Sequence, residues 1–406
     1  MRYPILYQFL YLIEAFSLLW AVSGQQAAVF GNEVGPLQLD TEGPLVPDNY
    51  SQYHPLFNDY GFVIRGNTSD GQDFSLWMFM YRQTGSEEVI LDADVYQIAF
   101  IHGHFSADEG ERQQMHDTPF VNTGQNIEDY YDVGTLQSTG NASTVAYSIA
   151  NTTLSYDGDT QTWRAYGTHA GVTVDITMTS VADEFLHAGS FANLAGCAAN
   201  TTATNYNCSG IAGGIIHATA TGTIAYNGTT TTLDQAYAVH ERIIQARTVA
   251  SRIQNAWGNG AYWLHAWGRH FSFWSFDADL GSYASGMLTI GNRTYVTSGA
   301  NNPNVTRSQT DEWLDPKSHQ LVGTAWRVSI ATDLGLLESQ VTGFGRLYYY
   351  WVRKGGLIIT TQVIADAEST LTFKNGSVLH DHQFAFVEAF RTMYIATPLP
   401  WTIGED

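Results

Sequence analysis

Three polar side chains that could donate or accept a proton lie in an unusually aromatic stretch of the chain. Tyr262, His265 and His270 fall within residues 255–288, where aromatic residues are far denser than their 13% share of the whole sequence. A mainly apolar surface with a few polar groups is the usual composition of a small-molecule site. We therefore expect these three residues to be catalytic, as hydrogen-bond donors or acid–base groups. The alternative is a β core whose polar tips reach backbone or solvent.

Aromatic side chains around these residues could form the walls of such a pocket. A second aromatic concentration lies at residues 348–353, where strand alternation would turn Tyr349, Trp351 and Arg353 to one face as an opposing wall. Ordinary core packing is again the alternative for each residue. The predicted substrate-binding residues are Trp257, Trp267, Trp274, Trp351 and, as an oxygen clamp, Arg353.

Short β-strands must position these residues, because alternating apolar residues and Gly or Asn turns recur along the chain. The second half of the aromatic stretch also alternates, so we interpret it as part of a strand pair. A helical period is weak and is confined to residues 365–370. We predict an all-β fold of the barrel or sandwich type. Further strands are predicted at residues 73–81, 89–104, 147–156, 162–166, 172–180, 219–226, 236–249, 320–331, 336–343, 345–352, 356–364 and 382–395.

Composition and charge exclude several classes of function. The net charge is -21 and the chain has three lysines, so it has no basic patch for nucleic acid or an anionic membrane surface. The sequence contains no nucleophile elbow, phosphate-binding loop or dinucleotide fingerprint. His102 with His104, and His380 with His382, each supply two ligands without a third. We therefore predict neither a metal nor a cofactor.

The N-terminus has the pattern of a secretory signal peptide, because Arg2 precedes an apolar run through Trp20 and small residues follow. We predict that residues 1–24 are removed, that no stable membrane span remains, and that the protein is secreted or enters a vacuolar or vesicular lumen. There, Cys197 and Cys208 should form one disulfide. The predicted glycan acceptors are Asn49, Asn67, Asn141, Asn151, Asn200, Asn207, Asn227, Asn292, Asn304 and Asn375.

The aromatic stretch resembles the signature of fungal two-domain, lipocalin-like proteins related to the carotenoid hydratase family, which includes secreted kievitone hydratases and Diels-Alderases of secondary metabolism. The matching pieces are Trp267-Gly268 and Leu280-Gly281-Ser282-Tyr283. The family's His-Asp pair is replaced by Trp263-Leu264, and the histidine is displaced to His265. The secretion and dense glycosylation predicted above also resemble the fungal enzymes that join tropolone units to humulene-type terpenes by hetero-Diels-Alder cycloaddition.

The resemblance implies two lipocalin-like β-barrel or sandwich domains with a cleft between them. The polar segment 296–317 is the best candidate for a linker, so we predict an N-terminal domain at 25–295 and a C-terminal domain at 296–406. The implied activity is a cofactor-independent cyclisation of hydrophobic polyketide or terpenoid substrates, with dehydration to a quinone methide as an optional first step. A hydratase acting on a prenylated phenolic, a non-catalytic lipocalin-like carrier and a carbohydrate-active protein are the alternatives.

Overall fold

The computed structural model describes residues 33–35, 55–83, 93–103, 120–122, 137–141, 143–169, 171–189, 211–226, 228–242, 244–246, 261–278, 283–314, 321–353 and 356–394. These residues form strands and turns and no helix, so the all-β prediction is confirmed for them. Among them there is accordingly no helix that could cross a membrane. The strands are β1 (Glu33–Gly35), β2 (Pro55–Thr68), β3 (Asp73–Gln83), β4 (Ala93–Gly103), β5 (Phe120–Asn122), β6 (Gln137–Gly140), β7 (Thr144–Ile149), β8 (Thr152–Asp157), β9 (Thr162–His169), β10 (Val172–Ser180), β11 (Glu184–Gly189), β12 (Ile211–Tyr226), β13 (Thr229–Glu241), β14 (Ile244–Ala246), β15 (Ala261–Gly268), β16 (Phe271–Ala278), β17 (Tyr283–Ile290), β18 (Arg293–Ala300), β19 (Val305–Leu314), β20 (Leu321–Ala331), β21 (Gly335–Arg353), β22 (Gly356–Phe373) and β23 (Val378–Tyr394).

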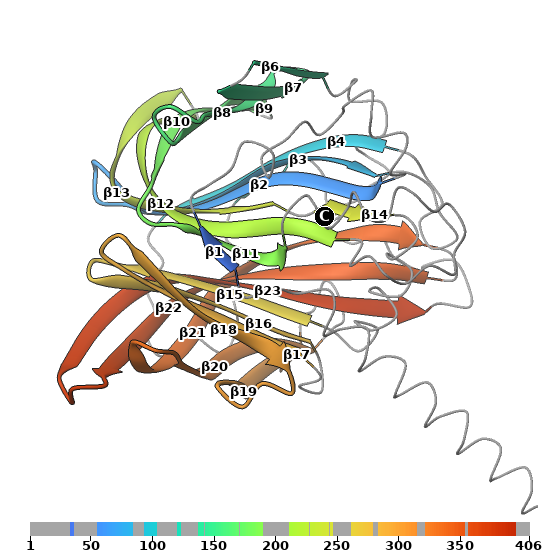
Figure 1. Ribbon diagram of the computed structural model, residues 1–406. Helices are drawn as coiled ribbons and strands as arrows, with labels where there is room; N and C mark the ends of the chain where they lie inside the picture. Colours follow the sequence, from blue (N-terminus) through green and yellow to red (C-terminus); the bar gives the residue numbers. More distant parts are fainter. Residues whose placement is uncertain are drawn as a thin grey trace, which may run out of the picture.

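Two curled antiparallel sheets make up the body of the molecule (Figure 1). The first sheet contains β1 to β14, and its main path runs β5-β4-β3-β2-β13-β12-β10-β9-β8-β7-β6. The second sheet runs β18-β17-β16-β15-β23-β22-β21-β20-β19. The chain leaves the first sheet after β14 and enters the second sheet at β15. The predicted boundary at residues 295/296 therefore does not separate the sheets, because it falls inside β18 of the second sheet. The division into two domains stays a prediction.

Each sheet curls around an apolar core of its own. The first core includes Phe62, Leu76 and Trp163, and the second includes Phe273 and Trp326. Strand alternation produces these cores, because every second residue of strands such as β10 is buried while its neighbours face outward. Separate cores under two curled sheets fit the lipocalin-like architecture.

A bulge in β12 helps the first sheet to curl. The register of β12 against β13 shifts between Ala220 and Thr223, and Gly222 has φ +141. A Cβ atom on Gly222 would lie 2.1 Å from the carbonyl oxygen of Asp175 in β10, so only glycine fits here.

Several local predictions are wrong, each for a reason visible in the strand pairing. Residues 365–370 are not helical, because they lie inside β22 and pair with β21 on one side and β23 on the other. The polar segment 296–317 contains the end of β18 and all of β19, an edge strand of the second sheet whose polar residues face outward. The single strand predicted at residues 147–156 is two strands, β7 and β8, with a turn between them. The two strands predicted at residues 336–343 and 345–352 are one strand, β21, which continues through a bulge at Gly343/Gly345.

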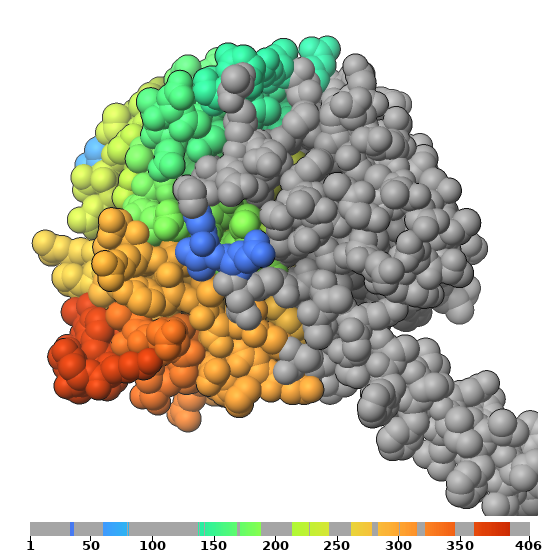
Figure 2. Space-filling view, in the orientation of Figure 1, coloured from blue at the N-terminus to red at the C-terminus, as the bar shows by residue number. Residues whose placement is uncertain are grey.

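The aromatic stretch predicted to be central forms the strands with both faces buried. Every residue of β15 is buried except Gly268, and β17 is buried from Tyr283 to Thr289. One face of β15 lies in the second core, so the other must meet another layer, which is the first sheet. Figure 2 shows β1, in blue, on the surface where residues of the first sheet, in green, meet residues of the second, in orange.

Candidate active site between the two sheets

One face of the second sheet carries aligned rows of polar and aromatic residues toward the first sheet. Cross-strand pairing places His265 of β15 between Trp274 of β16 and Phe386 of β23. Directly paired residues share a face of a sheet, so these three side chains form one row. The next row contains Glu388, Trp263 and Phe276, and Gln362 of β22 pairs with Glu388.

Side chains of the first sheet pack against these rows. The indole nitrogen of Trp267 donates a hydrogen bond to the carbonyl oxygen of Ala238, at 3.1 Å. The rings of Trp77 and Phe386 stack with centroids 5.6 Å apart, and the ring of His187 lies 5.3 Å from that of Trp274. The two sheets are therefore joined by aromatic packing together with directed hydrogen bonds.

His265 is enclosed by this packing. It is 1% exposed, and its ring stacks on Trp267 with centroids 5.8 Å apart and planes within 11°. Among the described residues, no hydrogen-bond partner reaches its Nδ1 atom. Burial, and then the nearby His217 and His187, hold the pKa of His265 well below 6.5. The imidazole is therefore neutral at pH 7, with one nitrogen able to donate and one able to accept.

His187 and His217 bring two more buried imidazoles from the first sheet. Burial lowers the pKa of each to about 3, so both are neutral at ordinary pH. His217 Nδ1 lies 2.5 Å from the hydroxyl oxygen of Ser272 in the second sheet. His187 Nε2 lies 3.8 Å from a carboxylate oxygen of Glu241. The three imidazoles form a neutral polar group within an aromatic layer.

Arg65 of β2 connects the first sheet to the backbone of the second through hydrogen bonds. It is fully buried, and its Nη1 atom donates to the carbonyl oxygens of Ala365 and Ala385, the latter at 2.7 Å. Its guanidinium lies 5.4 Å from the ring of Phe344 and 5.1 Å from that of Phe384. Burial lowers the pKa of Arg65, while nearby carboxylates raise it. Such placement makes this cation a rigid part of the sheet contact.

The row beside His265 holds a second polar group. Gln362 is fully buried, and neither its carboxamide oxygen nor its nitrogen has a hydrogen-bond partner in the part of the chain that the structure describes. Glu388, its cross-strand neighbour, is also buried. Buried polar groups are nearly always hydrogen-bonded in native proteins, so an unpaired carboxamide beside a buried carboxyl is unusual.

The structure separates the three residues predicted to be catalytic. His265 faces the first sheet, whereas Tyr262 lies on the opposite face of β15, in the second core. The guanidinium carbon of Arg307 lies 3.6 Å from the centre of the Tyr262 ring, and Arg307 forms a bidentate pair with Asp277. His270 is exposed in the turn after β15, where its backbone N–H donates to Asp381. Their catalytic roles stay predictions.

The structure describes the side chains of only two of the residues predicted to form the walls of the pocket. Trp267 and Trp274 are fully buried on the same face as His265. Trp351 and Arg353 belong to β21 and pair in register with Ile358 and Gly356, but their side chains lie outside the described part, as does Trp257. Cys197 and Cys208 also lie outside it, so the disulfide stays a prediction.

The predicted glycan acceptors lie mostly at turns. Asn141, Asn151, Asn292, Asn304 and Asn375 are exposed between strands, whereas Asn67 is half-buried near the end of β2. Asn49, Asn200, Asn207 and Asn227 lie outside the described residues. Accessibility at five positions is compatible with modification, which stays a prediction.

Within the described ranges, no three His, Cys, Asp or Glu side chains are arranged to hold a metal ion. His380 Nδ1 lies 3.0 Å from the Thr370 hydroxyl, and His382 Nδ1 lies 2.8 Å from Glu368 Oε1, both on an exposed hairpin. Their imidazoles thus have near neighbours within the hairpin itself.

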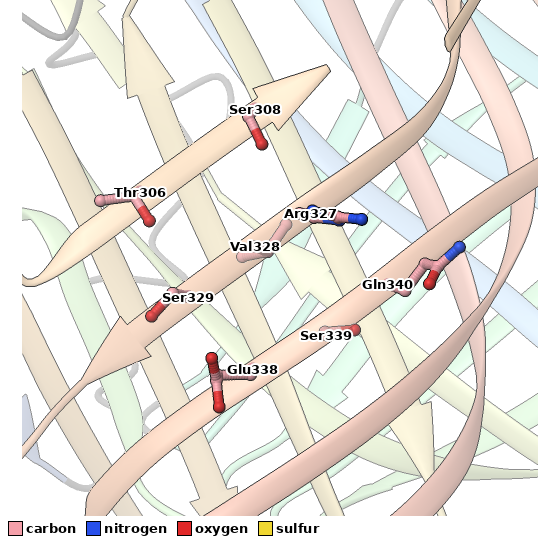
Figure 3. Close-up of a pocket in the computed structure, with 8 residues that line it drawn as sticks. All are labelled: Thr306, Ser308, Arg327, Val328, Ser329, Glu338, Ser339 and Gln340. Carbon is pink, nitrogen blue, oxygen red and sulfur yellow. The ribbon is translucent and has the colours of Figure 1, made fainter. Parts of the chain in front are cut away.

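A hollow on the exposed face of β19 to β21 differs from this region in chemistry (Figure 3). It has a volume of about 270 Å³ and lies between polar side chains, with Thr306 and Ser308 on one strand and Glu338 and Gln340 on another. Arg327 stands between them. A second hollow, of about 570 Å³, includes Asn141 and Arg164. The first lacks an aromatic wall, so the inter-sheet rows are the better candidate site.

Sequence reasoning missed the residues that the first sheet contributes. His187, His217 and Arg65 occur singly within apolar strands, a pattern that indicates burial but does not name a partner. Gln362 and Ser272 were missed for the same reason. The one available signal was a polar residue inside an apolar run, which marks a buried polar group without locating what faces it.

Comparisons with known proteins support the architecture. No family model and no curated protein sequence matches the chain. A putative AttH from Nitrosomonas europaea shares the fold with a TM-score of 0.50 at 13% identity, over 89% of this chain and 98% of that one. Kievitone hydratase from Nectria haematococca has a TM-score of 0.46 at 10% identity, over 90% of this chain and 98% of its own. The Diels-Alderase CghA with Sch210972 has a TM-score of 0.41 at 10% identity, over 83% and 88%. The fold is thus shared with the AttH protein, and kievitone hydratase and a Diels-Alderase are also among the similar structures.

Proposed function

We propose that this chain is a secreted, cofactor-independent cyclase that catalyses a hetero-Diels-Alder reaction between two hydrophobic substrates. One observation carries the proposal: His265 is a neutral, buried imidazole with an unpaired Nδ1, stacked on Trp267 and flanked by Trp274 and Phe386. An aromatic layer with a polar, uncharged group suits neutral, flat substrates better than ionic ones.

To catalyse this reaction, the protein needs to align the two substrates and to donate a hydrogen bond to one of them. In the cycloaddition, three π bonds of a heterodiene and an alkene become two σ bonds and one π bond, with no net proton transfer. Stacking rings can hold the partners in reactive alignment, which is worth several kcal/mol. A neutral imidazole N–H can donate to the carbonyl oxygen of the heterodiene and favour the charge that develops there.

The neutrality of the imidazoles weighs against a hydratase. Adding water to an alkene needs a group that delivers a proton to carbon, and an imidazole with a strongly lowered pKa is unprotonated at pH 7. A hydro-lyase is the second candidate because of one residue, Glu388, a buried carboxyl on the same face one row from His265. The same carboxyl could assist the loss of water that generates a quinone methide.

Product mass separates these functions. The purified protein would be incubated with a tropolone quinone-methide precursor plus humulenol and, separately, with a prenylated isoflavonoid, followed by high-resolution mass spectrometry. We expect a coupled adduct, formed faster and more selectively than without protein. A gain of one water on the single substrate would instead identify a hydratase. Unchanged compounds that co-purify with the protein would identify a carrier.

A further inference from the structure

We propose that Asn141 carries an N-linked glycan whose first sugars lie in the larger of the two hollows described above, on the outward face of the first sheet. A glycan at this position requires only the secretion that the proposed function includes. It is therefore independent of the proposed reaction.

The side chain of Asn141 is held in an orientation that leaves its linking nitrogen accessible. The residue is exposed between β6 and β7 and begins the acceptor sequence Asn-Ala-Ser. Its Oδ1 atom accepts hydrogen bonds from the backbone N–H groups of Ser143 and Thr144, at 2.9 and 3.0 Å, and from the Ser143 hydroxyl at 3.3 Å. Its Nδ2 atom has no partner among the described residues.

The Nδ2 atom is the one that N-glycosylation modifies. In that step Nδ2 bonds to the anomeric carbon of the first sugar of a lipid-pyrophosphate-linked oligosaccharide. One amide proton and the lipid pyrophosphate leave. The folded turn needs no rearrangement to keep the product, because the hydrogen bonds within it all use Oδ1.

The hollow beside Asn141 has the size of a ligand site and opens on the outside of the sheet. Its volume is about 570 Å³, and Asn141 is among the residues that line it. Pockets for small ligands typically measure about 300–1,000 Å³. Ser155 of β8 and Thr177 of β10 also line it, and both pair with Arg164, so the three share one face. Met178 lies in the first core, so its neighbour Thr177 faces outward.

The polar groups left free in this hollow suit a neutral ligand rich in hydroxyls. Arg164 is engaged by Asp175 through two bonds of 2.9 Å, and Asp157 accepts hydrogen bonds from two backbone N–H groups of the turn that follows it. The hydroxyls of Ser155 and Thr177 have no partner in the described part of the chain. Each can donate one hydrogen bond and accept two, as the hydroxyls of a sugar do.

Attachment at the edge of the hollow makes the binding intramolecular. A glycan linked to Asn141 stays close to the hollow, so its effective concentration there is on the order of millimolar, as for other short flexible tethers. A free saccharide would need a comparable concentration in solution to compete. The attached glycan is therefore the occupant that the arrangement favours.

Asn375 provides a matched control within the same chain. It is exposed between β22 and β23 and begins the acceptor sequence Asn-Gly-Ser. Its Oδ1 atom accepts hydrogen bonds from the backbone N–H of Ser377 at 2.9 Å and from the Ser377 hydroxyl at 2.7 Å. The local geometry is thus similar to that of Asn141, but Asn375 lines neither of the two hollows.

The test measures how fast a peptide N-glycosidase releases each glycan. The full-length protein would be secreted from yeast, and glycopeptide mass spectrometry would give the occupancy of both acceptors. We expect Asn141 to be occupied, and its glycan to leave the folded protein about tenfold more slowly than that of Asn375, the scale of one or two hydrogen bonds. In denatured protein the two rates should be equal. An unoccupied Asn141, or equal rates in the folded protein, would overturn the proposal.

Substitutions in the hollow distinguish binding from hindrance by the turn alone. Ser155→Ile combined with Thr177→Ile removes two free hydroxyls from the hollow, so release at Asn141 should approach the rate of the control glycan. Thr153→Ile combined with Thr179→Ile changes outward residues of the same two strands that do not line the hollow, and release should stay slow. Slow release that persists in the first double variant, or is lost equally in both, would contradict the assignment.

Failure of the proposed function gives a different result. Glycan release needs no turnover, and the comparison of the two acceptors in the wild type needs no substitution. A protein that protects the Asn141 glycan but forms no adduct with humulenol would refute the cyclase assignment alone. A protein that forms the adduct but releases both glycans at one rate would refute the glycan site alone.

Discussion

Lowering the pH from 7 to 5 should destabilise the protein, and replacing His217 by glutamine should remove a defined part of that effect. His217 has a pKa of about 3 in the folded protein and an ordinary value of 6.5. At pH 5 the unfolded chain therefore carries a proton on this imidazole and the folded protein does not. Because the unfolded state binds more protons, stability falls as the pH decreases from 6.5 toward 3.

The size of the effect follows from the two pKa values. Integrated between pH 7 and pH 5, one such histidine lowers the free energy of unfolding by about 2 kcal/mol. His187 has the same folded pKa and should contribute a similar amount. The wild type should thus lose roughly 4 kcal/mol from these two residues alone. In His217→Gln the loss should be smaller than in the wild type by about 2 kcal/mol.

Urea unfolding at pH 7, 6 and 5 would measure these values for the wild type, His217→Gln and a control, His380→Gln. His380 is an exposed histidine outside the contact between the sheets, so it serves as the surface control for the substitution itself. The amide of glutamine can keep a hydrogen bond to Ser272. If the wild type and His217→Gln lose stability in parallel between pH 7 and 5, the burial argument for the sheet interface is refuted.

Three further substitutions test separate parts of the structure. His265→Ala should lower cyclisation turnover at least roughly tenfold while the fold persists, because the site loses its hydrogen-bond donor. Steady-state kinetics would measure this loss of turnover. Arg65→Ala should lower the free energy of unfolding by about 3 kcal/mol in urea titrations, because it removes the hydrogen bonds and ring contacts that join the sheets. Asp277→Asn should cost roughly 1–2 kcal/mol by the same measurement, because it breaks the partly buried bidentate pair with Arg307.

The chain offers matched controls for these three. For His265→Ala the control is His380→Ala, which should keep wild-type turnover; equal losses in both variants would remove His265 from the chemistry. For Arg65→Ala and Asp277→Asn the control is Arg164→Ala, because Arg164 is an exposed arginine that forms a bidentate pair with Asp175, as Arg307 does with Asp277. Screening by water makes that pair weak, so its loss should change stability little. If Arg164→Ala lowers the free energy of unfolding as much as Arg65→Ala or Asp277→Asn does, the role assigned to burial is contradicted.

The all-β fold could be predicted because alternation is a local property. Strand β10 is found where the sequence predicts it, at residues 172–180, since one side of it is buried and the other is not. Residues 365–370 show the limit of such reasoning. Their local pattern admits a helix, but pairing with β21 and β23 over the whole segment fixes a strand.

The candidate site could be predicted only in part. The aromatic stretch was identified, and Trp267, Trp274 and His265 share a face of the sheet pair. Tyr262 and His265 are three residues apart, so alternation along a strand already requires opposite faces, and the structure places them so. His217 and Gln362 could not be found, because nothing local to either strand specifies what packs across the two sheets.

The burial of β15 on both faces makes the two sheets cooperative in folding. Separated from the first sheet, the second would expose Trp263, His265 and Trp267 to water, and the first would expose Trp77 and an uncompensated guanidinium at Arg65. Neither half has a water-compatible surface at this layer, so loss of either sheet removes much of the free energy that holds the other. Thermal denaturation should therefore proceed as a single event, and a chain divided between β14 and β15 should yield fragments that reassemble or aggregate.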